Sequence, residues 1–279
     1  MSDLYPVNAE FAAQSRIDRD EYQRAYRESI EQPDKFWGKA AERLDWIRKP
    51  TRIKDVSYAL EDFHVRWFDD GVLNASVLCL DQQLIKRKDK TAILFEPDGP
   101  DSPSYAVTYR ELYERVCKLG NALRSLGVQK GDRVTIYLPM IPDAAVAMLA
   151  CARIGAIHSV VFGGFAANSI ADRVADCGTK LIITADEGLR GGKKVPLKAN
   201  VDAALKLPGT NTVETVLVVR HTGGAVDMQM PRDRWFDAVV DSQPAECEPE
   251  PMEAEEPLFI LYTSGSTGKP KGVLHTTGG

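Results

Sequence analysis

The chain has 279 residues, enough for one large domain or two modest ones, and its apolar and charged fractions of 44% and 27% are ordinary for a globular protein. The formal net charge of −5 at pH 7 gives no electrostatic footprint for nucleic acid. The N-terminus lacks the apolar core of a signal peptide and no stretch approaches the length of a membrane span. We therefore expect a cytoplasmic protein without a nucleic-acid or membrane partner.

The cysteines form no recognisable metal or disulfide pattern. There are five, with no CxxC pair and no histidine at metal-ligand spacing: Cys79, Cys117, Cys151, Cys177 and Cys247. This pattern predicts free thiols in a reducing compartment and no metal site.

Residues 1–90 predict an N-terminal, mainly helical extension, with candidate helices at 18–29 and 33–46. From residue 91 the pattern changes to alternating strands and helices. Strands at 92–95 and 105–108 flank a segment rich in proline and glycine, and this arrangement predicts a hairpin.

The rest of the chain predicts an α/β fold. Apolar strands at 133–138, 158–162, 180–184 and 215–219 alternate with helices at 112–126, 143–154, 167–176 and 195–206. Strands that are nearly all apolar are typical of a mainly parallel sheet flanked by helices on both faces. The six glutamates within 246–256 predict a solvated linker.

An apolar strand at 258–262 leads into the loop TSGSTGKPKG at 263–272, and another strand follows at 272–276. Glycines in this loop permit positive φ, the hydroxyls donate hydrogen bonds, and two lysines add charge, a composition that suits a polyphosphate. A solvated turn remains an alternative. A Walker A loop does not fit, because only two residues separate Gly265 from Gly268 and Pro270 follows Lys269.

The same ten residues resemble the phosphate loop of the adenylate-forming enzymes. Residues 258–279, 26–37 and 67–74 are similar to segments of AMP-forming acetyl-CoA synthetases, and the resemblance covers nearly the whole chain. It implies that 1–90 is the N-terminal extension of that family. It also implies that 91–279 is the first part of the AMP-binding domain, an incomplete adenylate-forming fold that stops after the phosphate loop.

The implied activity is that of an acetate–CoA ligase that forms AMP. Acetate, ATP with Mg²⁺, and CoA would be the substrates, with no bound organic cofactor. Propionyl-CoA synthetase, or a truncated non-catalytic module that binds CoA or a nucleotide, remain alternatives. Members of the family continue well past residue 279 with the acyl pocket, the Mg²⁺ ligands and a catalytic lysine. We therefore expect no catalytic residue in this stretch and no acetate activation by the 279 residues alone.

Ligands of open α/β sheets bind beyond the carboxyl ends of the strands, where three glycine-rich loops are predicted. The first holds Gly163 and Gly164, the second spans 187–194, and the third is the phosphate loop. Taken alone, the first fits a tight strand exit and the second a solvated surface turn. Asp186 and Glu187 are expected to be solvated, and all four histidines to be structural.

The resemblance implies roles for these loops. Arg190 and Lys193 would contact the 3′-phosphate of CoA, Gly191 and Gly192 would let the backbone approach it, and Gly163 and Gly164 would form a floor beneath the pantetheine. The family usually has arginine where this chain has Lys193, which predicts slightly weaker CoA binding. The residues implied to close on the β and γ phosphates of ATP are Thr263, Ser264, Gly265, Ser266, Thr267, Gly268, Lys269, Lys271 and Gly272.

Overall fold

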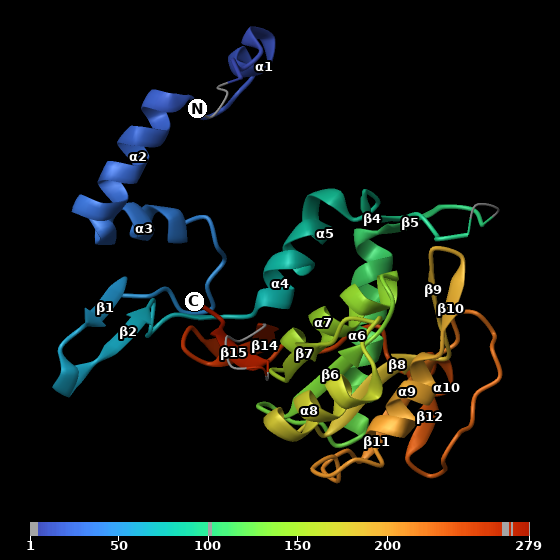
Figure 1. Cartoon of the computed structure of the whole chain (residues 1–279). Helices are drawn as coiled ribbons and strands as arrows, with labels where there is room; N and C mark the ends of the chain where they lie inside the picture. The colour runs from blue at the N-terminus through green and yellow to red at the C-terminus, as the bar shows by residue number, and fades with distance from the viewer. Residues whose placement is uncertain (1–4, 100–101, 264–267, 269, 279) are drawn as a thin grey trace.

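The computed structural model describes residues 5–99, 102–263, 268 and 270–278, and its body is built on a seven-stranded sheet with strand order β12-β11-β8-β6-β7-β14-β15 (Figure 1). Its strands are β6 (Arg133–Tyr137), β7 (Ile157–Val160), β8 (Leu181–Ala185), β11 (Thr215–Val219), β12 (Asp233–Trp235), β14 (Pro257–Thr263) and β15 (Lys271–Thr276). All neighbours run parallel except β14 and β15, which are antiparallel. The predicted mainly parallel sheet is confirmed.

Helices cover this sheet. They are α6 (Tyr109–Ser125), α7 (Pro142–Arg153), α8 (Ala167–Cys177), α9 (Leu197–Ala204) and α10 (Phe236–Val240). Helix α6 contacts α7 and α10, while α8 contacts α9. Strands β8 and β11 are buried at every residue, as parallel strands are when helices lie on both faces.

Local sequence signals set the ends of these helices. Thr108 caps α6 and exchanges hydrogen bonds with Glu111, which forms a capping box. Gly127, with φ of 82°, follows the last turn of α6, and Gly178 ends α8 in the left-handed conformation. The helix predicted to end at residue 126 therefore ends within one residue of that position.

Two hairpins that follow the N-terminal extension lie outside the main sheet. Strands β4 (Thr91–Phe95) and β5 (Tyr105–Thr108) pair antiparallel, as predicted. Strands β9 (Gly188–Arg190) and β10 (Lys193–Val195) form a second hairpin where the sequence predicted only a loop. Gly191 and Gly192, with φ of 56° and 72°, form its two-residue turn, a geometry that suits the twist of short hairpins.

The N-terminal extension holds helices, as predicted, and also strands that were not. In chain order its elements are α1 (Ala9–Ala13), α2 (Arg19–Glu31), α3 (Pro33–Ala41), β1 (Lys54–Ser57), the 3₁₀ helix η1 (Leu60–Asp62), β2 (His64–Trp67), β3 (Val72–Leu73), α4 (Ala75–Cys79) and α5 (Asp81–Arg87). The helix predicted at 33–46 ends early, at Ala41. There the indole N–H of Trp46 donates to the carbonyl of Ala41 at 2.9 Å and the chain folds back.

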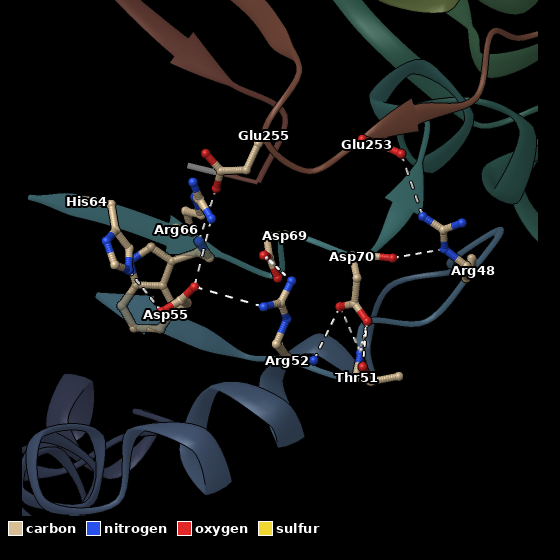
Figure 2. A network of polar contacts seen from close by, with 11 residues as sticks. Arg48, Thr51, Arg52, Asp55, His64, Arg66, Asp69, Asp70, Glu253 and Glu255 are labelled. Atoms are coloured by element: carbon tan, nitrogen blue, oxygen red, sulfur yellow. Dashed lines mark hydrogen bonds and ion pairs between the residues drawn. The ribbon is translucent and has the colours of Figure 1, made fainter. Parts of the chain in front are cut away.

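Polar contacts hold the segments around the β1–β2 hairpin together and join the hairpin to the body (Figure 2). The Asp70 carboxylate accepts hydrogen bonds from the Thr51 hydroxyl and from the backbone N–H groups of Thr51 and Arg52. These bonds, the Thr51 hydroxyl first, lower the pKa of Asp70 to about 2. Glu255 accepts the backbone N–H of Trp67 at 3.1 Å, so the extension is held by residues close to β14.

The acidic segment 246–256 is not a solvated linker, and that prediction is wrong. Cys247, Met252 and Ala254 are buried, and β13 (Met252–Glu253) pairs with β3 of the extension. Lys130 forms ion pairs with Glu250 and Glu256. The many glutamates made the segment look solvated in the sequence, but the residues Cys247, Met252 and Ala254 between them point inward.

All five cysteines are free, as predicted from their spacing. Among the described residues, no helix is both long and apolar enough to cross a bilayer.

Candidate functional site

Three glycine-rich segments lie at one edge of the sheet. Strands β7, β8 and β14 run in the same direction, because β6 pairs parallel with β7 and β8, and β14 pairs parallel with β7. The segments that follow these strands therefore leave from a common edge. These are Gly163–Gly164, the β9–β10 hairpin, and the start of the loop after Thr263. The predicted gathering at one carboxyl edge is confirmed for the first two segments and for the end of β14, from which the third begins.

An apolar cavity of about 760 Å³ opens at this edge. Its walls come from β4, the segment after β6, the exit of β7, β9 and β14, and include Phe95, Met140, Phe162, Leu189 and Leu261. Gly163, Gly164 and Arg190 also line it. One rim of the cavity therefore carries a cation and a glycine pair, while its walls are hydrophobic.

Close packing explains the glycine pair. A Cβ atom at Gly163 would lie 3.0 Å from the carbonyl oxygen of Leu138. At Gly164 it would lie 2.8 Å from Arg190 Nη1 and 2.7 Å from the ring of Phe162. A side chain at position 164 would thus displace the guanidinium from its place over the Phe162 ring, where the two are 5.0 Å apart.

Arg190 and Lys193 face each other as the pair that closes the hairpin, and both are exposed. In the described part of the chain, neither forms an ion pair with a carboxylate, whereas Lys194 next to them pairs with Glu187 at 2.7 Å. Two cations are therefore displayed together at the tip of a short hairpin. Such a pair is suited to a phosphate group.

The glycines of the turn have a partner that the sequence did not reveal. The backbone N–H groups of Gly191 and Gly192 donate to the two carboxylate oxygens of Asp98 at 3.1 and 2.9 Å. These bonds, that from Gly192 first, lower the pKa of Asp98. These N–H groups are therefore already bonded to Asp98 in this structure, and the approach of the backbone to a ligand phosphate stays a prediction.

The base of the hairpin is fixed by the two carboxylates that the sequence left as solvated. Asp186 is 1% exposed and accepts backbone N–H groups from Glu187, His221, Thr222 and Gly223. Glu187 accepts from Lys194 and from the Thr222 hydroxyl, which together lower its pKa. The prediction that these two carboxylates are solvated is wrong. The position of Asp186 directly after a wholly buried strand was the sequence signal for its burial.

Part of the predicted phosphate loop lies outside the described residues, namely Ser264, Gly265, Ser266, Thr267 and Lys269. Of the described members, Gly268 has φ of 92°, Thr263 pairs with Lys271, and Gly272 lies opposite Tyr262. A Cβ atom at Gly272 would lie 3.2 Å from the Tyr262 ring. The strands on either side confirm the predicted strand-loop-strand arrangement.

A cluster missed by sequence reasoning supports the strand that enters this loop. The Tyr262 hydroxyl donates to Asp176 on α8 at 2.7 Å. The guanidinium of Arg173, a residue that is 6% exposed, lies 5.1 Å from the Tyr262 ring and 4.8 Å from that of Phe165. Burial raises the pKa of Tyr262. Arg173 thus links the segment after β7 to the end of β14. Its position among the apolar residues of α8 was the sequence signal for its burial.

The described residues contain no group of three or more His, Cys, Asp or Glu that could hold a metal ion. They do not by themselves form a Mg²⁺ site.

Comparisons with known proteins agree with this geometry. The sequence model of the AMP-binding enzyme family matches residues 80–279. The chain belongs to the AMP-binding enzyme family. A second model, described as acetyl-coenzyme A synthetase N-terminus, matches residues 22–79.

Relatives within the family carry a consistent name. The chain is 82% identical over 279 residues to an acetyl-coenzyme A synthetase of Xanthomonas campestris pv. campestris (strain 8004) and 72% identical to one of Xylella fastidiosa (strain 9a5c). Both matches cover 100% of this chain and 43% of the relative. An acetoacetyl-CoA synthetase from Streptomyces lividans has a similar structure, with a TM-score of 0.84, 27% identity, and coverage of 98% of this chain and 43% of that one. The chain thus spans less than half the length of these relatives.

Proposed function

We propose that this chain supplies the CoA-binding and ATP-phosphate-binding face of an AMP-forming acetyl-CoA synthetase. The observation that carries the proposal is that Gly163–Gly164 and the β9–β10 hairpin lie at the sheet edge where β14 ends, beside a cavity that Arg190 also lines. The names of the most similar relatives support acetate as the acyl substrate.

The reaction has two halves. A carboxylate oxygen of acetate attacks the α-phosphorus of ATP, which forms acetyl-adenylate and releases pyrophosphate. The thiol of CoA then attacks the acetyl carbon, and AMP leaves. Mg²⁺ would accompany ATP as a counter-ion, and no step is assigned to it because the described residues offer no ligand set.

This chain contributes charge and position. Arg190 and Lys193 neutralise the 3′-phosphate of CoA, and the ring of Phe162 holds the guanidinium in place. The apolar cavity beside Gly163 and Gly164 accepts the pantetheine arm. The loop from Thr263 to Gly272 closes on the β and γ phosphates of ATP.

The test separates the two half-reactions in the full-length protein. We expect acetate-dependent exchange between ATP and pyrophosphate, followed by formation of acetyl-CoA. Arg190→Ala should raise KM for CoA by about tenfold, as expected for the loss of one charge-assisted phosphate contact, and leave the exchange unchanged. Lys206→Ala, which removes an exposed cation beyond the end of α9, is the control.

Three outcomes would count against the proposal. Absence of exchange with CoA binding retained would favour a non-catalytic binding module. A faster reaction with propionate than with acetate would favour propionyl-CoA synthetase. Exchange by the 279 residues alone would contradict the expectation that they lack acetate activation.

A further inference from the structure

The β9–β10 hairpin has little support of its own. Each strand has three residues, and the two pair only with each other, not with a strand of the seven-stranded sheet. An isolated two-stranded hairpin is marginally stable in water, so contacts outside it must fix its position. Its base has such contacts, through Glu187 with Lys194 and Thr222.

At the tip, the contact is Asp98. This residue lies in the connection between β4 and β5, more than 90 positions away in sequence from the two glycines that it binds. Its carboxylate accepts both N–H groups that the turn directs outward. The β4–β5 hairpin and the β9–β10 hairpin are thereby joined, and residues of both line the apolar cavity.

The position of the tip decides where two cations point. Arg190 precedes the glycine pair and Lys193 follows it, so a shift of the turn moves both side chains. Because the carboxylate of Asp98 already occupies the N–H groups, an anion at this tip must be bound by the side chains. The placement of Arg190 and Lys193 therefore depends on the hydrogen bonds between Asp98 and the turn, which form without a ligand.

We propose that Asp98 is a positioning residue for CoA, which holds the hairpin tip so that Arg190 and Lys193 meet the 3′-phosphate. This inference rests on the proposed function. The competing possibility is that the negative charge of Asp98 simply repels the phosphate. The two differ in sign, because loss of positioning weakens CoA binding and loss of repulsion strengthens it.

The experiment compares CoA with 3′-dephospho-CoA in the full-length enzyme. Asp98→Ala is expected to raise KM for CoA by about three- to tenfold, while KM for dephospho-CoA stays within about twofold of wild type. The ATP–pyrophosphate exchange should not change, because it precedes CoA. Asp98→Asn, which keeps one acceptor oxygen, should recover part of the affinity.

Glu96→Ala is the matched control. Glu96 is exposed in the same connection and also carries one negative charge, but it makes no hydrogen bond to the hairpin in the described structure. Its removal should leave KM for CoA unchanged. Equal thermal unfolding midpoints for wild type and variants would show that the variants fold.

Several results would overturn the inference. They are a lower KM for CoA in Asp98→Ala, an equal change for CoA and dephospho-CoA, and no change at all. Calorimetric binding of both ligands to the wild type separates this inference from the function on which it rests. Equal affinity for the two ligands would refute a phosphate contact, and with it the role of Asp98. Tighter binding of CoA than of dephospho-CoA, without ATP–pyrophosphate exchange, would refute the proposed ligase activity but not the role of Asp98.

Discussion

Lys193 and Arg190 occupy equivalent places on the two strands of the β9–β10 hairpin but differ in how they can bind a phosphate. A guanidinium presents a planar fork that forms two parallel hydrogen bonds to phosphate oxygens. An ammonium acts as a single point charge. The hairpin thus offers one directional and one non-directional contact.

This difference leads to a prediction for Lys193→Arg. The substitution should lower KM for CoA in the full-length enzyme by about threefold, because it adds a second directional contact without changing the charge. Lys206→Arg, the same change at an exposed site after α9, should have no effect. An unchanged KM in the Lys193 variant would mean that this side chain does not reach the phosphate.

At the level of residues, sequence reasoning found the polar groups that face solvent and missed those that serve the backbone. Arg190 and Lys193 stand in a glycine-rich segment after a strand, which is a local pattern. The carboxylates of Asp98 and Asp186 accept hydrogen bonds from N–H groups that are distant in sequence, so no spacing along the chain predicts these bonds. Such partnerships follow only from the three-dimensional path of the chain.

Among the elements, the strands β7, β14 and β15 carry an aromatic stack. The ring of His158 lies 5.5 Å from that of Phe259, which lies 4.5 Å from that of His275. Burial lowers the pKa of His158 to about 4. The native protein therefore holds this imidazole neutral where an unfolded chain, with a histidine pKa of about 6.5, would protonate it.

The sign of the pH effect follows from this difference. Between about pH 6.5 and pH 4 the unfolded chain binds a proton that the native protein does not. The free energy of unfolding should thus decrease as pH falls through this window, by at most about 3 kcal/mol, and His158 should add no pH dependence above it.

His158→Phe in the full-length protein should remove this component, since the phenyl ring keeps the stack but cannot be protonated. The measurement is the urea midpoint from pH 7 to pH 4, with His221→Phe as control. Equal acid sensitivity in wild type and His158→Phe would show that other groups dominate.

Prediction from sequence succeeded for elements that carry their own signal. Strands β8 and β11 are apolar except for one threonine each, and α6 has a cap, a periodic apolar face and a terminal glycine. Strands β1 and β2 have no such pattern. Each has four residues, and they are held by contacts such as that between His64 and Asp55 and the packing of Trp37 on Trp67. Those contacts exist only once the extension has folded.

For the molecule as a whole, Asn74 joins three distant segments. Its side-chain amide donates to the carbonyls of Ala152, Arg153 and Glu250, and its oxygen caps α4. The side chain is almost completely buried, so every one of these groups would lose a partner if it were removed. Extension, sheet body and the segment before β14 meet at this one residue.

Asn74→Ala should therefore lower the free energy of unfolding of the full-length protein by about 3 kcal/mol, because the carbonyls of Ala152, Arg153 and Glu250 would each lose a side-chain donor and α4 would lose its cap. Limited proteolysis within the extension should become faster. Asn211→Ala, at an exposed turn before β11, is the control for the loss of an amide side chain. A loss of stability no larger than in this control would show that the three segments are held together elsewhere.

The pairing of β13 with β3 has a consequence for how the protein is made. The ribosome must add about 180 residues after β3 before its partner strand exists, which takes roughly 10 to 40 seconds at about 5 to 20 residues per second. During that interval the nascent extension lacks the pairing of β13 with β3. It carries aromatic side chains that are exposed even in the folded chain, such as Tyr22, Tyr26 and Trp37. Its exposure to proteases and to aggregation is therefore greatest during synthesis.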